Sequence, residues 1–260
     1  DSGSISTLYR NTRVLFSSSA EGDVAWSVAG LTWQSRADDH GYWALSSNQK
    51  LPLQAAWHPI QSSVTPSSAA FVLVHDERNR NGIISDIDDT ILVSEVGDKI
   101  KLLKNSLSIP PESRLAVAGV AKLYTELARR NPNPAVTPIF YLSASPKQLT
   151  DGIRRFLRKN NFPQGVLMLK EVGHESQDPL LDQQVYKVAK ISQVMRAFPS
   201  VKFALIGDDG ERDPESYAEI QRLFPRQVAG VWIRRVSADP ERARWAGQRD
   251  LADLFAYGVK

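Results

Sequence analysis

The chain places acidic side chains directly after short apolar runs at two points. Asp86 and Asp88 follow residues 82–84, and Asp208 follows residues 203–206. Two unit charges about 4 Å apart repel each other by about 4 kcal/mol at an effective dielectric constant near 20, so clustered carboxylates require a cation, hydrogen bonds or protonation. A hard divalent cation meets this requirement with oxygen ligands. The alternative interpretation is that Asp86 to Thr90 only cap the next helix.

A third polar group follows another apolar run. Residues 139–142 lead into Ser143-Ala144-Ser145-Pro146. In an open parallel sheet, ligands bind in the crevice beyond the carboxyl ends of the strands. Each polar group taken alone is explained as a turn or a cap, but three such groups at predicted strand ends favour one shared pocket.

The elements that position these groups alternate between short apolar runs and amphipathic segments from about residue 70 onward. This order is typical of βαβ units with a mainly parallel sheet. The expected strands are residues 82–87, 138–142, 166–169, 201–206 and 228–233. The expected helices carry apolar stripes with spacings of three, four or seven, which lie at Leu115, Val120, Leu123 and Leu127, then Leu149, Ile153, Phe156 and Leu157, then Val185, Val188, Val194 and Phe198.

The N-terminal quarter of the chain has a different pattern. Apolar residues alternate at period two in residues 24–28 and again in 42–45, with residues 38–41 as the turn between them. Tryptophans concentrate here, and we expect them to fill a small β-sandwich core, with a docking face as the alternative. They are Trp26, Trp33, Trp43 and Trp57. A linker or long loop is expected in the Ser- and Pro-rich residues 61–68.

Composition excludes several classes of site. The 260 residues include no cysteine, which rules out disulfides, thiolate zinc sites and cysteine nucleophiles. The four histidines show no metal-ligand spacing, so any metal is expected on oxygen ligands. The net charge of +3 is too small to indicate nucleic-acid binding, and no nucleic-acid motif is present. Because no apolar run approaches the roughly 20 residues of a membrane helix, we expect a soluble protein.

The chain begins at Asp1, and its first residues lack the basic and apolar stretches of a signal peptide. We therefore expect a processed or trimmed chain. Removal of a secretion signal would explain this start, and the absence of cysteine is compatible with an oxidising compartment. We expect an exported protein or one that is peripheral to a membrane. Trimming of the chain explains the start at Asp1 equally well.

The motifs as a set resemble those of haloacid dehalogenase (HAD) superfamily phosphatases. The wording of residues 82–91, 141–146 and 205–215 is similar to the catalytic domain of the actin-patch phosphatidate phosphatase family and its bacterial relatives, and more distantly to lipins. Residues 38–43 also resemble the β-rich region that precedes this domain in bacterial members. The resemblance covers roughly residues 70 to 237.

The resemblance implies an α/β fold with a HAD-like Rossmannoid parallel sheet and helices on both faces, preceded by a small β-sandwich-like N-terminal domain. The expected boundary gives a β-rich domain at 1–75 and a catalytic domain at 76–260.

The same resemblance implies a role for each motif residue. Asp86 is the expected nucleophile, Asp88 the general acid/base, and Ser143 a hydrogen-bond donor to the phosphoryl oxygens. Attack by an Asp carboxylate forms an aspartyl-phosphate and divides one difficult displacement into two easier ones. Asp88 can then protonate the leaving alkoxide and deprotonate the attacking water.

The cofactor implied by the resemblance is Mg²⁺. Its expected ligands are Asp86, Asp208 and the carbonyl of Asp88. Asp209 or Asp213 is expected to support these ligands without binding the cation directly.

The motif lysine is less sharply defined. The context of residues 185–188 resembles the family motif best and selects Lys187, with Lys190 and Lys170 as alternatives. A lysine on a helix is ordinarily solvated, and only the motif order favours Lys187.

The substrate expected from the resemblance is a phosphorylated lipid, phosphatidate, hydrolysed to diacylglycerol and phosphate. The candidate substrate-binding residues are Thr90, Ala144, Lys99 and Lys104. Residues 147–160 carry a net charge of +4 and residues 222–249 a net charge of +5, which suits an anionic membrane surface or describes solvated helix faces. The alternatives are a phosphatase for a soluble phosphomonoester, or a non-catalytic lipid- or protein-binding module, which the intact acids argue against.

Overall fold

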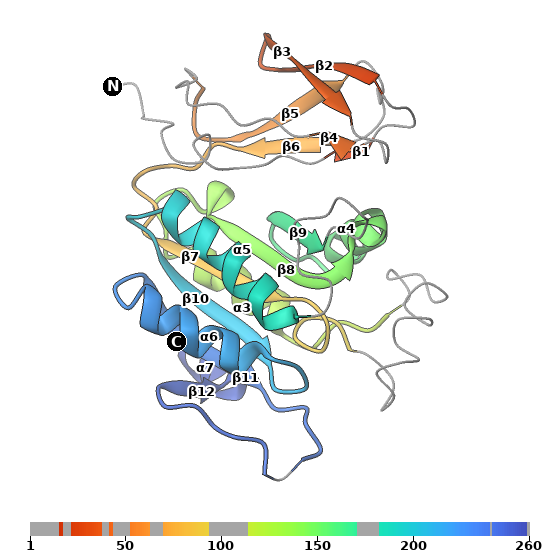
Figure 1. Ribbon diagram of the computed structural model, residues 1–260. Helices are drawn as coiled ribbons and strands as arrows, with labels where there is room; N and C mark the ends of the chain where they lie inside the picture. Colours follow the sequence, from red (N-terminus) through yellow and green to blue (C-terminus); the bar gives the residue numbers. More distant parts are fainter. Residues whose placement is uncertain are drawn as a thin grey trace.

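The computed structural model describes residues 16–17, 22–37, 42–43, 53–62, 70–93, 114–170, 182–239 and 241–258. It contains a larger α/β part and a smaller N-terminal β part (Figure 1). Within these described ranges, no helix combines the length and the apolar character that crossing a membrane requires.

The larger part is built on a six-stranded parallel sheet with the order β12-β11-β10-β7-β8-β9. Its strands are β7 (Asn81–Asp86), β8 (Ile139–Pro146), β9 (Val166–Lys170), β10 (Lys202–Asp208), β11 (Val228–Arg234) and β12 (Gln248–Asp250). The predicted parallel sheet is confirmed, and the five expected strands are all present. The short β12 was not predicted because its three residues are polar and form no apolar run.

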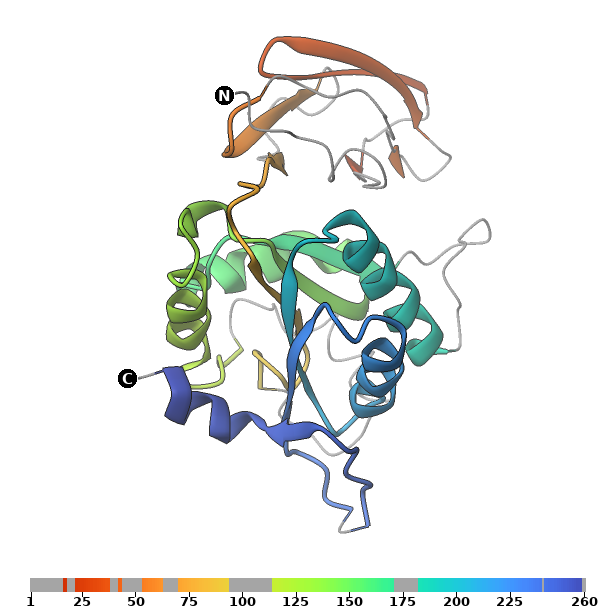
Figure 2. The same ribbon diagram turned by 90° about the vertical axis from the view of Figure 1, so that its left-hand side faces the viewer.

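Helices cover both faces of this sheet because the apolar strand residues alternate between two cores. Ile84 and Leu205 belong to the core beneath α5 (Gln183–Ala197) and α6 (Asp213–Leu223). Ile83 and Ile206 belong to the opposite core, which is covered by three helices. These are α3 (Val120–Ala128), α4 (Thr150–Lys159) and α7 (Leu251–Gly258), and 3₁₀ turns occupy Pro134–Val136 and Lys147–Leu149. Figure 2 shows α3 and α7 on one side of the strands and α5 and α6 on the other.

Two residues of the predicted apolar stripes are exposed. Leu115 is 64% exposed and precedes α3, which begins only after Gly119. Val185 is 51% exposed because the buried stripe of α5 runs through Tyr186, Lys187 and Ile191 instead. A buried lysine does not register in an apolar pattern, so the sequence misplaced this face of α5.

The N-terminal part is β-rich, as predicted. A four-stranded antiparallel sheet has the order β3-β2-β5-β6, and a two-stranded sheet pairs β1 with β4. The strands are β1 (Phe16–Ser17), β2 (Gly22–Val28), β3 (Leu31–Ala37), β4 (Tyr42–Trp43), β5 (Trp57–Ser62) and β6 (Ala70–Leu73). Ala29 and Gly30 both have positive φ, which is the conformation of a two-residue hairpin turn between β2 and β3.

The tryptophans of this part have different partners. Trp26 is buried and stacks on Trp33 with a centroid separation of 4.7 Å, as expected for a β core. Trp57 instead packs against the core of the larger sheet and donates a hydrogen bond to the carbonyl of Ala135 at 3.1 Å. The predicted linker begins too early, because Gln61 and Ser62 belong to β5. The remainder of that linker and the predicted turn at residues 38–41 lie outside the described residues.

Candidate active site

The three polar groups after the strands meet at one edge of the sheet. Asp86 ends β7, Asp208 ends β10, and Ser143 lies in β8. Because β7 pairs with both β10 and β8, these residues lie on adjacent strands, at the point where the strand order reverses. The three polar groups that the sequence predicts to share one pocket therefore lie together at one edge of the sheet.

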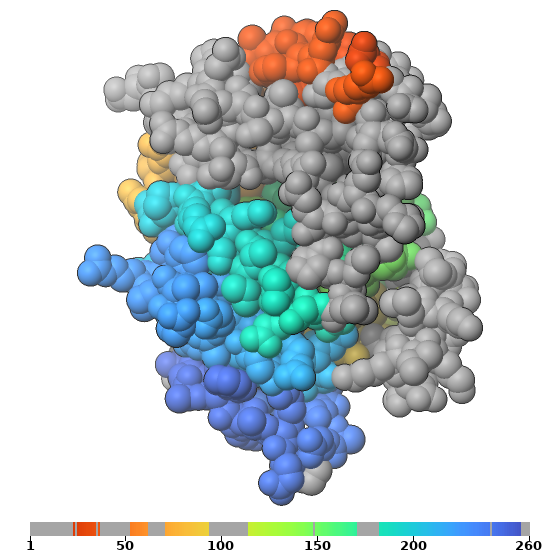
Figure 3. All heavy atoms as spheres, viewed as in Figure 1, coloured from red at the N-terminus to blue at the C-terminus, as the bar shows by residue number. Residues whose placement is uncertain are grey.

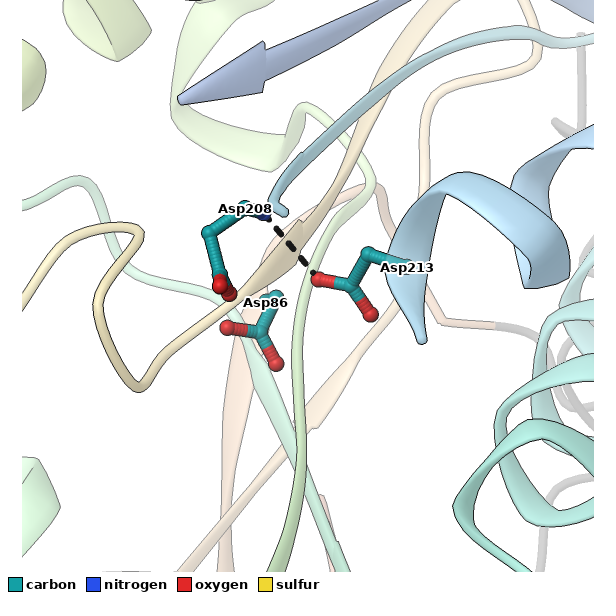
Figure 4. A group of neighbouring side chains, drawn as sticks. All are labelled: Asp86, Asp208 and Asp213. Carbon is teal, nitrogen blue, oxygen red and sulfur yellow. Dashed lines mark hydrogen bonds between the residues drawn. The ribbon is translucent and has the colours of Figure 1, made fainter. Parts of the chain in front are cut away.

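Three carboxylates form a buried cluster at this edge. Asp86, Asp208 and Asp213 are each at most 3% exposed, and one oxygen of each lies within 4.8 Å of the others. Figure 4 shows the three side chains converging from β7, β10 and the first turn of α6. Gly207 permits this approach, because a Cβ at that position would lie 2.4 Å from the Asp213 carboxylate.

Lys187 supplies a buried positive charge to the cluster. The side chain of Asp182 caps α5 by accepting hydrogen bonds from the backbone N–H groups of Gln184 and Val185. Lys187 is the fifth residue of α5, and its Nζ donates to Asp86 Oδ1 at 2.7 Å and to Asp213 Oδ1. Lys187 is 1% exposed, so the lysine that the motif order selected lies inside the cluster rather than in solvent.

The charges of the cluster do not balance. Burial alone would lower the pKa of Lys187, but the carboxylates of Asp213 and Asp86 raise it well above its ordinary value, so the ammonium stays charged. Burial raises the pKa of Asp86 well above the usual range, and it raises the pKa of Asp208 to about 8, with Asp213 adding repulsion in both cases. If all three carboxylates were ionised, they and the ammonium would carry a net charge of −2, which one divalent cation would neutralise.

One carboxylate oxygen is left for such a cation. Asp86 Oδ2 is buried and accepts no hydrogen bond from the described residues. Asp213 is already engaged, since Oδ1 accepts from Lys187 and Oδ2 accepts from the Asp208 N–H at 3.3 Å. Asp208 Oδ1 accepts from the Gly210 N–H at 2.7 Å, and Oδ2 lies 3.5 Å from the Thr90 hydroxyl. These all-oxygen donors fit a hard divalent cation beside Asp86 and Asp208.

The second acid, Asp88, is held by two serines of β8. Its Oδ2 accepts hydrogen bonds from the Ser143 hydroxyl at 2.8 Å and from the Ser145 hydroxyl at 3.1 Å. The Ser145 N–H also donates to Ser143 Oγ at 2.9 Å. Ser145 was not among the predicted site residues, although its position two residues after Ser143 in a strand places both side chains on the same face.

The other predicted residues divide into three groups. Thr90 is buried beside Asp208, and Ala144 is partly buried against the apolar core beneath α5. Lys99 and Lys104 lie outside the described residues. The two alternative lysines instead approach the ring of Tyr186, with Nζ-to-centroid distances of 5.8 Å for Lys170 and 5.5 Å for Lys190.

Asp209 and Glu211 lie in the loop between Asp208 and Asp213, and their side chains have different partners. Asp209 turns away from the cluster, and its Oδ1 accepts from the N–H groups of Val236 and Ser237. Glu211 Oε2 lies 3.9 Å from the Lys187 Nζ. The sequence did not single out Glu211, because it follows Asp208 in a run of polar residues without a spacing of its own.

A cavity of about 520 Å³ beside α3 shares no residue with this site.

Comparison with known proteins adds to this geometry. Residues 81–235, more than half of the chain, match the family described as phosphatidate phosphatase APP1, catalytic domain. The chain belongs to this family. The APP1 catalytic-domain match includes every residue of the acid cluster, Lys187 and both serines that hold Asp88.

Two fungal proteins are similar to this member of the APP1 catalytic-domain family. Phosphatidate phosphatase APP1 of Saccharomyces cerevisiae is 31% identical over 178 residues, which cover 68% of this chain and 29% of that protein. An uncharacterised protein of Schizosaccharomyces pombe is 27% identical over 164 residues, which cover 63% of this chain and 26% of that protein. The chain thus spans less than a third of the length of these relatives. A solved structure of the Pnkp1/Rnl/Hen1 complex aligns over 82% of this chain and 59% of that chain, with 13% identity and a TM-score of 0.43.

The buried acids predict a pH-dependent stability. Because burial and Asp213 raise the pKa of Asp208 from 3.8 to about 8, the folded protein retains a proton that the unfolded chain releases at lower pH. The free energy of unfolding of the cation-free protein should therefore fall as the pH rises from about 4 to about 8. A saturating divalent cation replaces the proton and should remove most of this slope.

Urea unfolding at acidic, neutral and alkaline pH, in EDTA and in MgCl₂, measures this effect. The Asp208→Asn variant is the matched control, since it removes one of the two buried acids with a raised pKa and should reduce the slope in EDTA. Identical slopes in EDTA and MgCl₂ would contradict the prediction.

Proposed function

We propose that this chain is a Mg²⁺-dependent phosphatase of the HAD type that hydrolyses phosphatidate to diacylglycerol and phosphate. The observation that carries the proposal is Asp86, a buried carboxylate with one oxygen fixed by Lys187 and the other without a hydrogen bond from the described residues. Membership of the APP1 catalytic-domain family supports phosphatidate as the substrate.

Asp86 is the proposed nucleophile. Lys187 fixes Oδ1 at 2.7 Å and so orients the carboxylate for attack on phosphorus. In the first step, the Asp86–phosphorus bond forms while the bond from phosphorus to the diacylglycerol oxygen breaks. Water then cleaves the aspartyl-phosphate and regenerates Asp86 with release of phosphate.

Asp88 is the proposed general acid and base. It protonates the leaving alkoxide in the first step and takes the proton of the attacking water in the second. The hydroxyls of Ser143 and Ser145 hold its carboxylate from β8, which limits the side chain to one orientation. When substrate is bound, the Ser143 hydroxyl is the proposed donor to the phosphoryl oxygens, together with Thr90, while Ser145 keeps its hydrogen bond to Asp88.

Asp86, Asp208 and the carbonyl of Asp88 are the proposed ligands of Mg²⁺, and Asp213 supports them through Lys187 and the Asp208 N–H. When bound, Mg²⁺ neutralises negative charge on the phosphate and so allows an anionic nucleophile to approach it. The residues of the site otherwise carry a net negative charge, which would repel a phosphate ester.

Our remaining proposals concern the domain boundary and the residues that contact the lipid headgroup and the membrane surface. We divide it into a β-rich domain at residues 1–75 and a catalytic domain at 76–260, as the sequence suggested. Lys99 and Lys104 are proposed headgroup contacts together with Ala144. The basic residues of 147–160 and 222–249 would hold the protein peripherally at an anionic membrane surface.

The experiment compares phosphate release from several substrates by the purified chain. They are long-chain phosphatidate in mixed micelles, a short soluble phosphatidate, and sugar and nucleotide monophosphates, each with Mg²⁺ or after exhaustive chelation. We expect phosphatidate to be preferred and chelation to abolish its hydrolysis. Activity on micelles should also fall with salt, because the Debye length shortens from about 10 Å at 0.1 M to about 3 Å at 1 M.

Two results would contradict parts of this proposal. Preference for a sugar or nucleotide phosphate, with no hydrolysis of phosphatidate at any ionic strength, would replace the lipid with a soluble phosphomonoester. Undiminished activity after chelation would remove the cation from the mechanism.

A further inference from the structure

The segment that follows β11 holds the loop that carries Asp208. The N–H groups of Val236 and Ser237 donate to Asp209 Oδ1 at 2.7 and 2.8 Å. Arg242 adds contacts to the same loop and to the start of α6. All three donors lie beyond residue 235, where the match to the APP1 catalytic-domain family ends.

Arg242 makes the most extensive of these contacts. Its Nε donates to the carbonyl of Asp209 at 3.0 Å, and one terminal NH₂ group donates to the carbonyl of Glu211 at 2.7 Å. Both terminal NH₂ groups also bind the carboxylate of Glu215, at 2.5 and 2.8 Å. The Arg242 side chain is 19% exposed, so these bonds are partly shielded from water. Only a planar guanidinium offers donors in the directions that these acceptors require.

The position of these acceptors links Arg242 to the acid cluster. Asp209 directly follows Asp208, and the two carbonyls flank the turn in which the Gly210 N–H binds Asp208 Oδ1. Glu215 lies in the first turn of α6, two residues after Asp213. One side chain therefore holds both ends of the loop between two members of the cluster.

We infer that Arg242 is a positioning residue for the cation pocket, so that the catalytic unit of this chain extends past residue 235. The inference rests on the proposed cation site. Arg242 touches neither Asp208 nor Asp213, and it acts by fixing the loop that sets the distance between their carboxylates. Residues that orient metal ligands in this way typically change metal affinity or activity by about 10- to 100-fold when replaced.

The test replaces Arg242 with Gln and with Lys in the full chain. The matched control is Arg129→Gln, because Arg129 forms an exposed pair with Glu126 at 2.6 Å at the end of α3, outside the proposed membrane-binding stretches. Mg²⁺ and Mn²⁺ are titrated, and the cation-induced rise in the unfolding midpoint gives the affinity of each variant without any substrate. Hydrogen exchange of the amides in residues 209–215 is measured without cation.

We expect Arg242→Gln to weaken cation binding at least about 10-fold and to speed amide exchange in the loop. Arg242→Lys should behave similarly, because an ammonium keeps the charge but lacks the planar fork. Arg129→Gln should match the wild-type protein. In hydrolysis assays, the cation concentration for half-maximal activity should rise more than kcat falls.

Three results would overturn the inference. They are unchanged amide exchange in Arg242→Gln, full cation affinity in Arg242→Lys, and a lowered unfolding midpoint in Arg242→Gln with unchanged cation affinity, which would mark a merely structural role. A wild-type protein with neither cation binding nor phosphatidate hydrolysis would instead contradict the proposed function, while the exchange of residues 209–215 would still report whether Arg242 orders the loop.

Discussion

The Asp86→Asn variant should lose at least about 10³-fold in turnover while keeping its fold, because removal of a nucleophile eliminates the covalent route. An amide has the shape of the carboxylate and retains an oxygen that can accept the hydrogen bond from Lys187. Burial raises the pKa of Asp86, so a neutral group is well tolerated at this position. The unfolding midpoint of Asp86→Asn should therefore equal or exceed that of the wild-type protein.

The measurement is phosphate release from phosphatidate beside thermal unfolding of the same samples. Asp151→Asn is the matched control, since Asp151 is an 82% exposed aspartate on α4 and should leave both quantities unchanged. If folded Asp86→Asn protein kept more than about a tenth of the wild-type rate, Asp86 would be excluded as the nucleophile, because turnover through a covalent intermediate requires the nucleophile.

The Lys187→Met variant should lose both stability and activity. Removing one partner of a buried ionic network leaves uncompensated charge, which typically costs about 3–5 kcal/mol of the free energy of unfolding. In this variant the carboxylates of Asp86 and Asp213 would lose the Lys187 ammonium, with which both form ion pairs. The cost should shrink at acidic pH, where Asp86, whose pKa is raised by burial, becomes protonated. Turnover should fall at least about 100-fold, because the nucleophile is no longer held in its ionised form.

Lys190→Met is the control, one helical turn further along α5. Lys190 lies over the ring of Tyr186 at 5.5 Å, and such a contact is worth about 0.5–1 kcal/mol at an exposed site. Urea unfolding and phosphate release are measured for both variants. If Lys190→Met had the larger effect on turnover, Lys190 rather than Lys187 would be the motif lysine.

Strand-end chemistry was predictable from the sequence because its signals are local. A buried strand appears as a short apolar run, and Asp86, Ser143 and Asp208 each follow such a run within two residues. The parallel order of these strands then places their ends at one edge of the sheet. For the same reason, the expected strands agree with the observed ones to within two residues at most ends.

The contacts that complete the site were not predictable because they connect distant segments. Lys187 was selected only through the resemblance to the family motif, because it is 101 residues from Asp86 and no periodicity distinguishes a buried, paired lysine from a solvated one. Arg242 lies in a segment without an apolar pattern, and its acceptors at Asp209 and Glu211 are backbone carbonyls. Backbone carbonyls are present at every position and carry no signal in the sequence.

The proposed mechanism requires that the phosphoryl group become covalently bound to Asp86 during each turnover. The most direct test quenches the wild-type protein with acid during turnover of phosphatidate labelled in its phosphate, and maps the labelled peptide by mass spectrometry. We predict one hydroxylamine-labile phosphoryl group on Asp86 in the wild-type protein and none in the Asp86→Asn variant. Turnover with no labelled protein at any time point, or label on a different residue, would contradict it.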